Sequence, residues 1–235
     1  MATPSPTPTR TAHAILARAH RPIELFTRLV FDLEISGREN VPKTGPVVMA
    51  ANHLSLIDPP FVGLTIKRNV RYLALEELFG QSRFFDRLTL YFGAIPISRV
   101  RPTHGALRTA LEELARGGVV GVFPEGGRVA AWGEVEPKKG AAWLSMQSGA
   151  PLVPVALNGT EGTLSLTEPR IRRTAVRVWV DEPLHPDAYL DRVDPLAAMM
   201  EDWRRTLDSH LAPYFGSCGG RTSDIGRRTS ATDSR

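Results

Sequence analysis

Cysteine is almost absent from this sequence. The single cysteine, Cys218, stands among glycine and serine near the end of the 235-residue chain. One cysteine excludes an intramolecular disulfide framework and a zinc site built from cysteines, and it suits a reducing cytoplasm. A Gly-x-Ser-x-Gly motif is missing as well. No serine or cysteine therefore stands out as a covalent nucleophile.

Long apolar runs are missing too. No stretch approaches the roughly 18 residues needed to cross a bilayer. Residues 1–10 are rich in threonine and proline and do not resemble a signal peptide. We therefore expect a chain that is neither integral to a membrane nor secreted by a visible signal.

Neither sign of charge is in large excess. There are 29 Lys plus Arg against 25 Asp plus Glu, a net charge of +4, and arginine carries most of the positive charge. The planar arginine fork matches phosphate geometry, which favours anionic partners. The small excess does not choose between nucleic acid, a lipid headgroup and a phosphorylated metabolite. Because no nucleic-acid-binding module is recognisable, nucleic acid is not expected as a partner.

What is present is the composition of one globular domain, with 42% hydrophobic and 23% charged residues. Residues 1–10 and 216–235 lack apolar periodicity and are expected to be disordered tails. Between them lie apolar runs of strand length, at residues 47–51, 72–75, 94–97, 119–123, 152–157 and 176–180. These runs alternate with helical patterns, including residues 106–114, 140–148 and a helix starting at Asp194-Pro195. The alternation predicts an α/β domain over residues 36–215, with helices covering a largely parallel sheet.

Residues 11–35 predict an amphipathic helix pair, split at Pro22. Apolar side chains recur at helical spacing, at Ile15, Ala19, Ile23, Phe26 and Val30, and arginines fall elsewhere on the wheel. Such a pair can lie in a membrane interface with its arginines near anionic headgroups. A pair that simply packs on the sheet fits the pattern equally well, so both interpretations stay open.

Two polar residues follow the apolar run 47–51. His53 and Asp58 lie at the carboxyl end of a predicted strand, where open α/β sheets bind ligands. An imidazole held by a carboxylate leaves its other nitrogen as a base near neutral pH. The alternative is that Asp58 caps a helix starting at Pro59, although Pro59 and Pro60 supply no N–H for such a cap.

A second polar segment follows the apolar run 119–123. Its glycines, Gly126 and Gly127, let backbone amides approach an anion, and Arg128 adds a forked donor. The segment thus looks like a phosphate cradle, although a plain turn with a solvated arginine has the same composition. Arg99, at the end of run 94–97, and the pair Lys138-Lys139 are further candidates that could equally be solvated surface charges.

Taken in order, these segments resemble the blocks of the 1-acylglycerol-3-phosphate acyltransferase family of lipid synthesis. Asn52-His53 with Asp58 looks like the family's His-x4-Asp block, residues 93–99 like its second block, residues 123–128 like its Pro-Glu-Gly block, and residues 152–159 like its fourth. The resemblance covers nearly all of the chain between the two tails. It implies a mixed or mostly parallel sheet flanked by helices, as in glycerol-phosphate acyltransferases.

The resemblance also implies the chemistry. His53 would be the general base that Asp58 orients, and the acceptor would be surrounded by Asn52, Arg99, Glu125, Gly126, Arg128 and Lys139, with the arginines on its phosphate. The donor would be acyl-CoA or an acyl carrier protein thioester, with no further cofactor and no metal. The acceptor alcohol would be a lysophosphatidate-like lipid, met at the inner face of the cell membrane by a peripheral cytoplasmic protein.

One position departs from the family pattern. Gly127 stands where threonine or serine is usual, which removes a hydroxyl donor from the expected phosphate site. Acylation of another lipid or glycolipid alcohol is therefore an alternative, and so is a catalytically silent lipid-binding homologue.

Overall fold

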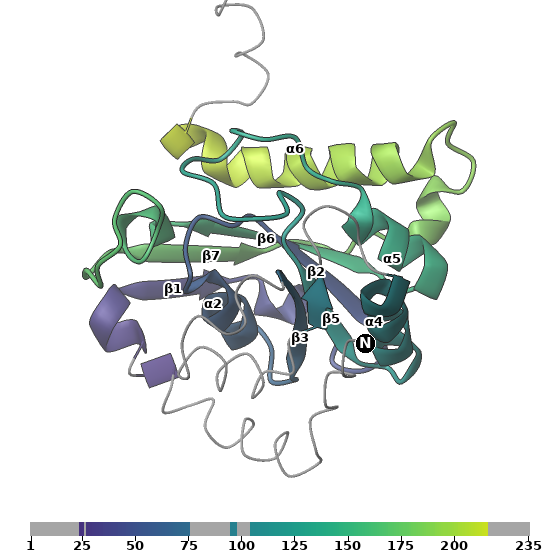
Figure 1. Cartoon of the computed structure of the whole chain (residues 1–235), viewed down its shortest axis with the longest axis horizontal. Coiled ribbons are helices and arrows are strands. Elements are labelled where there is room, and N and C mark those ends of the chain that lie inside the picture. Colours follow the sequence, from purple (N-terminus) through teal and green to yellow (C-terminus); the bar gives the residue numbers. More distant parts are fainter. Residues whose placement is uncertain (1–23, 26, 76–94, 98–103, 216–235) are drawn as a thin grey trace, which may run out of the picture.

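A central β-sheet organises the molecule. The structure is a computed structural model that describes residues 24–25, 27–75, 95–97 and 104–215 (Figure 1). Within these ranges the sheet has seven strands in the order β1-β7-β6-β2-β5-β3-β4. The strands are β1 (Leu33–Ser36), β2 (Val47–Ala51), β3 (Val70–Leu75), β4 (Ile95–Ile97), β5 (Val119–Val122), β6 (Leu152–Asn158) and β7 (Val176–Val180).

Most strands run in one direction. β6, β2, β5, β3 and β4 are parallel, β7 is antiparallel to β6, and β1 is parallel to β7. All five residues of β2 are buried, as expected for a strand covered on both faces. The predicted α/β fold with a mostly parallel, mixed sheet is confirmed.

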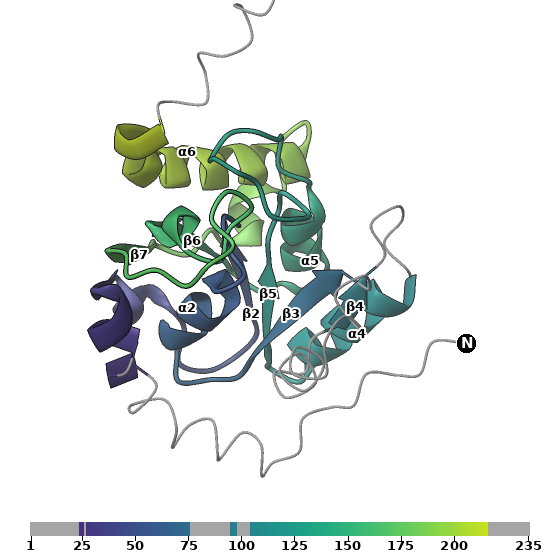
Figure 2. The same cartoon turned by 60° about the vertical axis from the view of Figure 1, so that its left-hand side comes forward.

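Helices cover both faces of the sheet. The described helices are α2 (Asp58–Leu64), α4 (His104–Ala115), α5 (Gly140–Ser148) and α6 (Pro195–Phe215), with short 3-10 turns at η1 (Arg38–Asn40), η3 (Thr160–Gly162) and η4 (Pro186–Tyr189). Val48 and Ala50 of β2 pack into one core with α4, α5 and α6. Met49 and Ala51 point the other way and pack with α2. In Figures 1 and 2, α2 accordingly lies on the side of the sheet away from α6.

The predicted helix boundaries agree with the structure. α4 was predicted over residues 106–114 and ends at Ala115, two residues before Gly117, whose φ of 75° is the left-handed conformation common after helix ends. α6 begins at Pro195, where Asp194 Oδ1 accepts a hydrogen bond from the N–H of Ala197 at 2.9 Å. Its apolar face is buried, with Trp203 fully inaccessible.

The N-terminal prediction needs a correction. The helix pair was expected over residues 11–35. Among the described residues of this stretch, 24, 25 and 27–31 are helical, whereas Leu33–Ser36 form strand β1. β1 pairs with β7, Leu33 lying opposite Val176. The residues Leu33-Glu34-Ile35-Ser36 alternate between apolar and polar, which suits a strand as well as the expected helix, and the pairing with β7 decides between them. The first helix of the expected pair and both expected tails lie outside the described residues.

The carboxyl ends of β2, β5 and β6 meet at one edge of the sheet, which we call the carboxyl edge. Loops 52–57, 123–139 and 159–175 follow these strands. Because β7 runs antiparallel to β6, the last of these loops stays at the same edge until β7 begins. Figure 2 brings this edge forward. No helix in the described ranges is both long enough and apolar enough to cross a membrane.

Candidate active site

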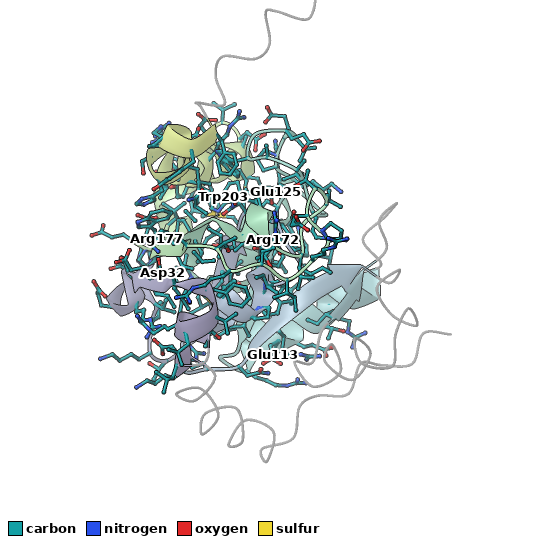
Figure 3. All side chains as sticks on the ribbon, turned by 90° about the vertical axis from the view of Figure 1, so that its left-hand side faces the viewer. Asp32, Glu113, Glu125, Arg172, Arg177 and Trp203 are labelled. Carbon is teal, nitrogen blue, oxygen red and sulfur yellow. The ribbon has the colours of Figure 1, made fainter. Side chains whose placement is uncertain are left out.

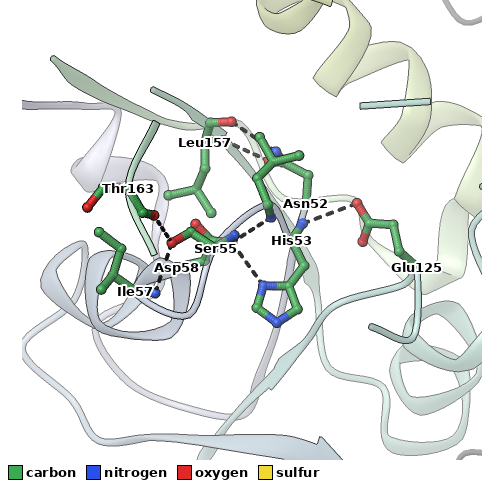
Figure 4. Close-up of polar contacts among 9 residues, drawn as sticks. Asn52, His53, Ser55, Ile57, Asp58, Glu125, Leu157 and Thr163 are labelled. Atoms are coloured by element: carbon green, nitrogen blue, oxygen red, sulfur yellow. Dashed lines mark hydrogen bonds and ion pairs between the residues drawn. The ribbon is translucent and has the colours of Figure 1, made fainter. Parts of the chain in front are cut away.

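The loop after β2 turns so that His53 and Asp58 meet. Nδ1 of His53 lies 2.9 Å from Oδ2 of Asp58 (Figure 4). Asp58 is fully buried, and its Oδ2 also accepts hydrogen bonds from the backbone N–H groups of Leu54 and Ser55, both at 2.6 Å. The carboxylate therefore organises the loop that carries His53.

The Asp58 side chain does not cap helix α2. α2 has no side-chain cap, and its first available amide, that of Phe61, bonds the carbonyl of Ile57 at 3.2 Å. Pro59 and Pro60 have no N–H to offer. With no donor left in the first turn, the carboxylate of Asp58 faces back toward the loop and the imidazole.

The loop is pinned to its neighbours. The Ser55 hydroxyl donates to the carbonyl of Thr163 at 2.6 Å, and the N–H of Leu56 donates to the carbonyl of Leu164 at 3.1 Å. Both bonds join it to the segment that precedes β7. The loop that carries His53 is thus held in place by a segment distant in sequence, which lowers the entropy lost when a substrate is positioned.

Asn52 has a different role from the one predicted. Its side chain is fully buried, with Nδ2 donating to the carbonyl of Leu157 at 2.9 Å and Oδ1 accepting from the N–H of Leu157 at 2.8 Å. Both polar ends of the amide are occupied by β6. The predicted contact between Asn52 and the substrate is therefore wrong, and Asn52 instead ties the end of β2 to its neighbour.

The imidazole of His53 lies flat on an aromatic ring. Its centroid is 4.1 Å from that of Phe123, with 22° between the planes, and Phe123 in turn stacks with Tyr72 at 5.9 Å. The His53 side chain is 14% exposed, and its Nε2 makes no hydrogen bond with any described residue. With Nδ1–H donated to the carboxylate, Nε2 carries the lone pair that can accept a proton.

The Pro-Glu-Gly turn clamps the backbone of His53. Oε1 of Glu125 accepts the N–H of His53 at 3.2 Å, and the carbonyl of His53 accepts the N–H of Val129 at 2.9 Å. Burial of the Glu125 carboxyl, reinforced by the nearby charge of Asp58, raises its pKa to about 8. Glu125 is therefore mainly protonated at neutral pH, and its buried Oε2, which has no partner among the described residues, is available as a donor.

Two cations flank this turn. Gly126 has a φ of 76°, and a Cβ added there would lie 2.6 Å from Nζ of Lys138, so the lysine approaches the turn closely. The backbone N–H of Lys138 donates to the carbonyl of Pro124 at 2.8 Å. Arg128 is partly exposed and makes no side-chain hydrogen bond or ion pair within the described ranges. Both side chains are available for an anionic group.

Lys139 was predicted to take part, and that role stays a prediction. Its Nζ pairs with Asp194 at 2.6 Å, and both side chains are about half exposed. Lys138 is the member of the pair that reaches the turn. The sequence pattern cannot show which of two adjacent lysines reaches the turn. The close approach of Lys138 to Gly126 shows that it is Lys138. Arg99 lies outside the described residues.

The turn also presents unused backbone donors. The N–H groups of Gly127 and Arg128 make no hydrogen bond to any described residue, whereas those of Gly126 and Val129 on either side are bonded. Two free amides next to a cation can stabilise a negative oxygen. No group of three or more His, Cys, Asp or Glu side chains in the described part is arranged to hold a metal ion.

Comparison with known proteins agrees with this geometry. Residues 32–158, which carry both the His53 loop and the Glu125 turn, match the family model Acyltransferase. The 1-acyl-sn-glycerol-3-phosphate acyltransferase of Bacillus subtilis is 30% identical over 172 residues, covering 72% of this chain and 83% of that protein. A chloroplastic enzyme of the same name from Brassica napus is 26% identical over 181 residues, covering 75% of this chain and 51% of that protein.

A solved structure is also similar to this chain. The crystal structure of the 1-acyl-sn-glycerophosphate (LPA) acyltransferase PlsC from Thermotoga maritima is similar with a TM-score of 0.66 and 27% identity, covering 85% of this chain and 80% of that one. Fold, family model and curated relatives therefore agree. This chain belongs to the acyltransferase family that includes the 1-acyl-sn-glycerol-3-phosphate acyltransferases.

Proposed function

We propose that this protein transfers a fatty acyl chain from an acyl thioester to the hydroxyl of a lysophosphatidate-like acceptor, as a step of phospholipid synthesis. The observation that carries the proposal is the pair at the carboxyl edge: Nδ1 of His53 is held 2.9 Å from a buried Asp58, while Nε2 has no hydrogen-bond partner among the described residues. Membership of the acyltransferase family, with relatives named for this reaction, supports the same assignment.

The residues suggest a direct transfer without an acyl-enzyme. Nε2 of His53 removes the proton of the acceptor hydroxyl as its oxygen attacks the thioester carbonyl. Asp58 stabilises the imidazolium that forms. When the tetrahedral intermediate collapses, the carbon–sulfur bond breaks and the imidazolium returns the proton to the leaving thiolate. The products are an ester and a free thiol, and His53 is again neutral.

The Pro-Glu-Gly turn is suited to the charged parts of the reaction. The free N–H groups of Gly127 and Arg128 can stabilise the oxyanion or a phosphate oxygen. Arg128 and Lys138 can neutralise the acceptor phosphate, with Arg99 as a further proposed contact. Protonated Glu125 can donate to an acceptor oxygen.

The donor and the place of action belong to the same proposal. We expect acyl-CoA or an acyl carrier protein thioester as co-substrate and no other cofactor. Because the acceptor is a lipid, we expect a peripheral protein at the inner face of the cell membrane. Gly127, which lacks the hydroxyl usual at that position, keeps other lipid or glycolipid alcohols in the set of acceptors to be tested.

A thiol-release assay tests the proposal. Purified protein is mixed with acyl-CoA or acyl carrier protein thioesters of several chain lengths, and with lysophosphatidate, a lysophospholipid with a larger headgroup, monoacylglycerol or a glycolipid. We expect acceptor-dependent thiol release that is fastest with lysophosphatidate. Faster release with an unphosphorylated acceptor would move the assignment to the other alcohols. No release with any pair would indicate a silent lipid-binding homologue.

A further inference from the structure

The segment between η3 and β7 places aliphatic side chains in water. In residues 164–173, here called the 164–173 loop, Leu166 is 54% exposed and Ile171 is 69% exposed. Single exposed aliphatic residues are ordinary on protein surfaces, but two on one short loop at a functional edge indicate a contact surface.

The same loop is strongly basic. Arg170, Arg172 and Arg173 are all exposed, and Glu168 is the only acidic residue of the loop. Arg172 pairs with Glu168 at 3.1 Å, whereas Arg170 and Arg173 make no ion pair with any described residue. Aliphatic residues interleaved with unpaired arginines match a surface that is anionic outside and apolar beneath, which is the profile of a membrane interface.

The loop has a defined shape. The N–H of Leu164 donates to the carbonyl of Arg170 at 3.1 Å, and the N–H of Ser165 donates to the carbonyl of Glu168 at 2.8 Å. The N–H of Arg172 donates to the hydroxyl of Thr163 at 3.0 Å. These bonds close the chain on itself and leave Leu166 and Ile171 outside, so little conformational entropy would be lost on docking.

The loop is adjacent to the catalytic residues. Its Leu164 carbonyl accepts the N–H of Leu56, and Ser165 forms a β-bridge with Ser55, within the segment that carries His53 and Asp58. In Figure 3, which looks onto the carboxyl edge, Arg172 lies on the same face as Glu125. A surface that held this loop would therefore face the catalytic site.

A second apolar element meets the same edge. Leu25 and Leu29, four residues apart on the helix that precedes β1, are 63% and 66% exposed. The residue after this helix contacts the start of β7, three residues beyond the 164–173 loop, because the carbonyl of Asp32 accepts the N–H of Val176 at 3.3 Å. Figures 1 and 2 place both segments at one end of the molecule. Exposed aliphatic residues on two separate elements favour an extended lipid surface as the partner, rather than a small acidic protein such as an acyl carrier protein.

We propose that the 164–173 loop docks this protein on an anionic lipid bilayer, with Leu166 and Ile171 in the acyl boundary and Arg170, Arg172 and Arg173 on the headgroups. The inference deepens the proposed function, on which it rests for its purpose: docking through this loop turns the His53 site toward lipid acceptors in the bilayer. It also assigns membrane contact to a loop next to the site, in addition to the N-terminal helix.

Vesicle binding of the full chain tests the docking. Binding is measured by co-sedimentation with vesicles of phosphatidylcholine alone or mixed with phosphatidylglycerol. The variants are Leu166→Ser with Ile171→Ser, and Arg170→Gln with Arg172→Gln and Arg173→Gln. Matched controls are Leu190→Ser with Val193→Ser, which are 65% and 108% exposed in the segment between η4 and α6, and Arg108→Gln with Arg205→Gln on α4 and α6.

We expect the double serine variant to lower the vesicle partition coefficient about ten-fold or more, because two aliphatic side chains lose their burial. The glutamine variant should reduce the preference for phosphatidylglycerol by roughly five-fold for each arginine in contact. The controls should bind like the wild type. Loop variants that bind like the wild type, with unchanged thermal unfolding, would overturn the inference.

A parallel assay separates this inference from the proposed function. Thiol release is followed with a short-chain acyl-CoA and a short-chain lysophosphatidate, both below their aggregation concentrations. The loop variants should retain wild-type rates there and lose rate only with acceptors embedded in vesicles. If the wild type releases no thiol, the proposed function fails while the binding data still test the loop. If the variants bind vesicles normally but lose rate only with an acyl carrier protein thioester, the loop serves that acidic protein and the lipid assignment is overturned.

Discussion

Glu125 accepts a hydrogen bond from the backbone N–H of His53 at 3.2 Å. This bond joins the turn after β5 to the loop after β2, so the Pro-Glu-Gly turn and His53 are one structural unit. A change in the charge or position of the Glu125 carboxyl should therefore be felt at His53.

The first prediction concerns stability and pH. The pKa of Glu125 is raised from 4.5 to about 8 by burial and by the charge of Asp58. Between these two values the unfolded chain releases this proton while the folded chain keeps it, so the free energy of unfolding should fall as pH rises through the window. Glu125→Gln keeps an acceptor for the His53 N–H and removes the titration. Urea unfolding at about pH 5 and about pH 9 should show a smaller loss for the variant than for the wild type. An identical pH dependence would contradict the assignment.

The second prediction concerns the base. His53→Ala should lower kcat by at least about 10²-fold, because no other described group is placed to take the proton from the acceptor. The matched control is His210→Ala. His210 Nε2 lies 3.0 Å from Asp181, a second histidine–carboxylate pair, formed by α6 and the residue after β7. Single-turnover thiol release should be normal in the control and nearly absent in His53→Ala, with far-UV circular dichroism unchanged in both. Retained turnover in His53→Ala would rule out the mechanism.

The third prediction concerns Asp58, whose Oδ2 serves two backbone amides and His53 at once. Asp58→Asn can keep an acceptor for the amides, but it no longer stabilises the imidazolium. We expect a fall in kcat of roughly 10²–10⁴-fold with little change in KM. Asp58→Ala should in addition destabilise the fold, since each buried N–H left unpaired costs about 1–3 kcal/mol. Thermal unfolding and steady-state kinetics separate the two effects. Equal unfolding free energies for wild type and Asp58→Ala would show that the amides find other partners.

The fourth prediction distinguishes the two adjacent lysines. Lys138 approaches the Gly126 turn, whereas Lys139 pairs with Asp194. Lys138→Ala and Arg128→Ala should each raise KM for a phosphorylated acceptor about ten-fold, the value of one lost charge-assisted contact. Lys139→Ala should leave KM nearly unchanged, because an exposed ion pair contributes little. An unphosphorylated acceptor serves as the reference, since its KM should respond to none of the three. If Lys139→Ala has the larger effect, the assignment within the pair must be reversed.

The sequence determined the scaffold of the site. Runs of strand length between amphipathic helices predicted the parallel sheet, and the strand ends placed His53 and Glu125 at one edge. The helical pattern at 106–114 predicted α4, and Asp194-Pro195 predicted where α6 begins. These features depend on residues close together in the chain, so a local pattern is enough to indicate them.

Only the tertiary structure decided how individual side chains are used. β1 forms because it pairs with β7. Both polar ends of the Asn52 side chain bond the backbone of Leu157. Asp58 bonds the His53 loop because the first turn of α2 has no N–H to offer it. Lys138 rather than Lys139 reaches the Gly126 turn. Each of these facts is a contact between segments far apart in the sequence or a choice among nearby hydrogen-bond partners. Such contacts form only when the segments are packed together, and a periodicity along the chain cannot encode them.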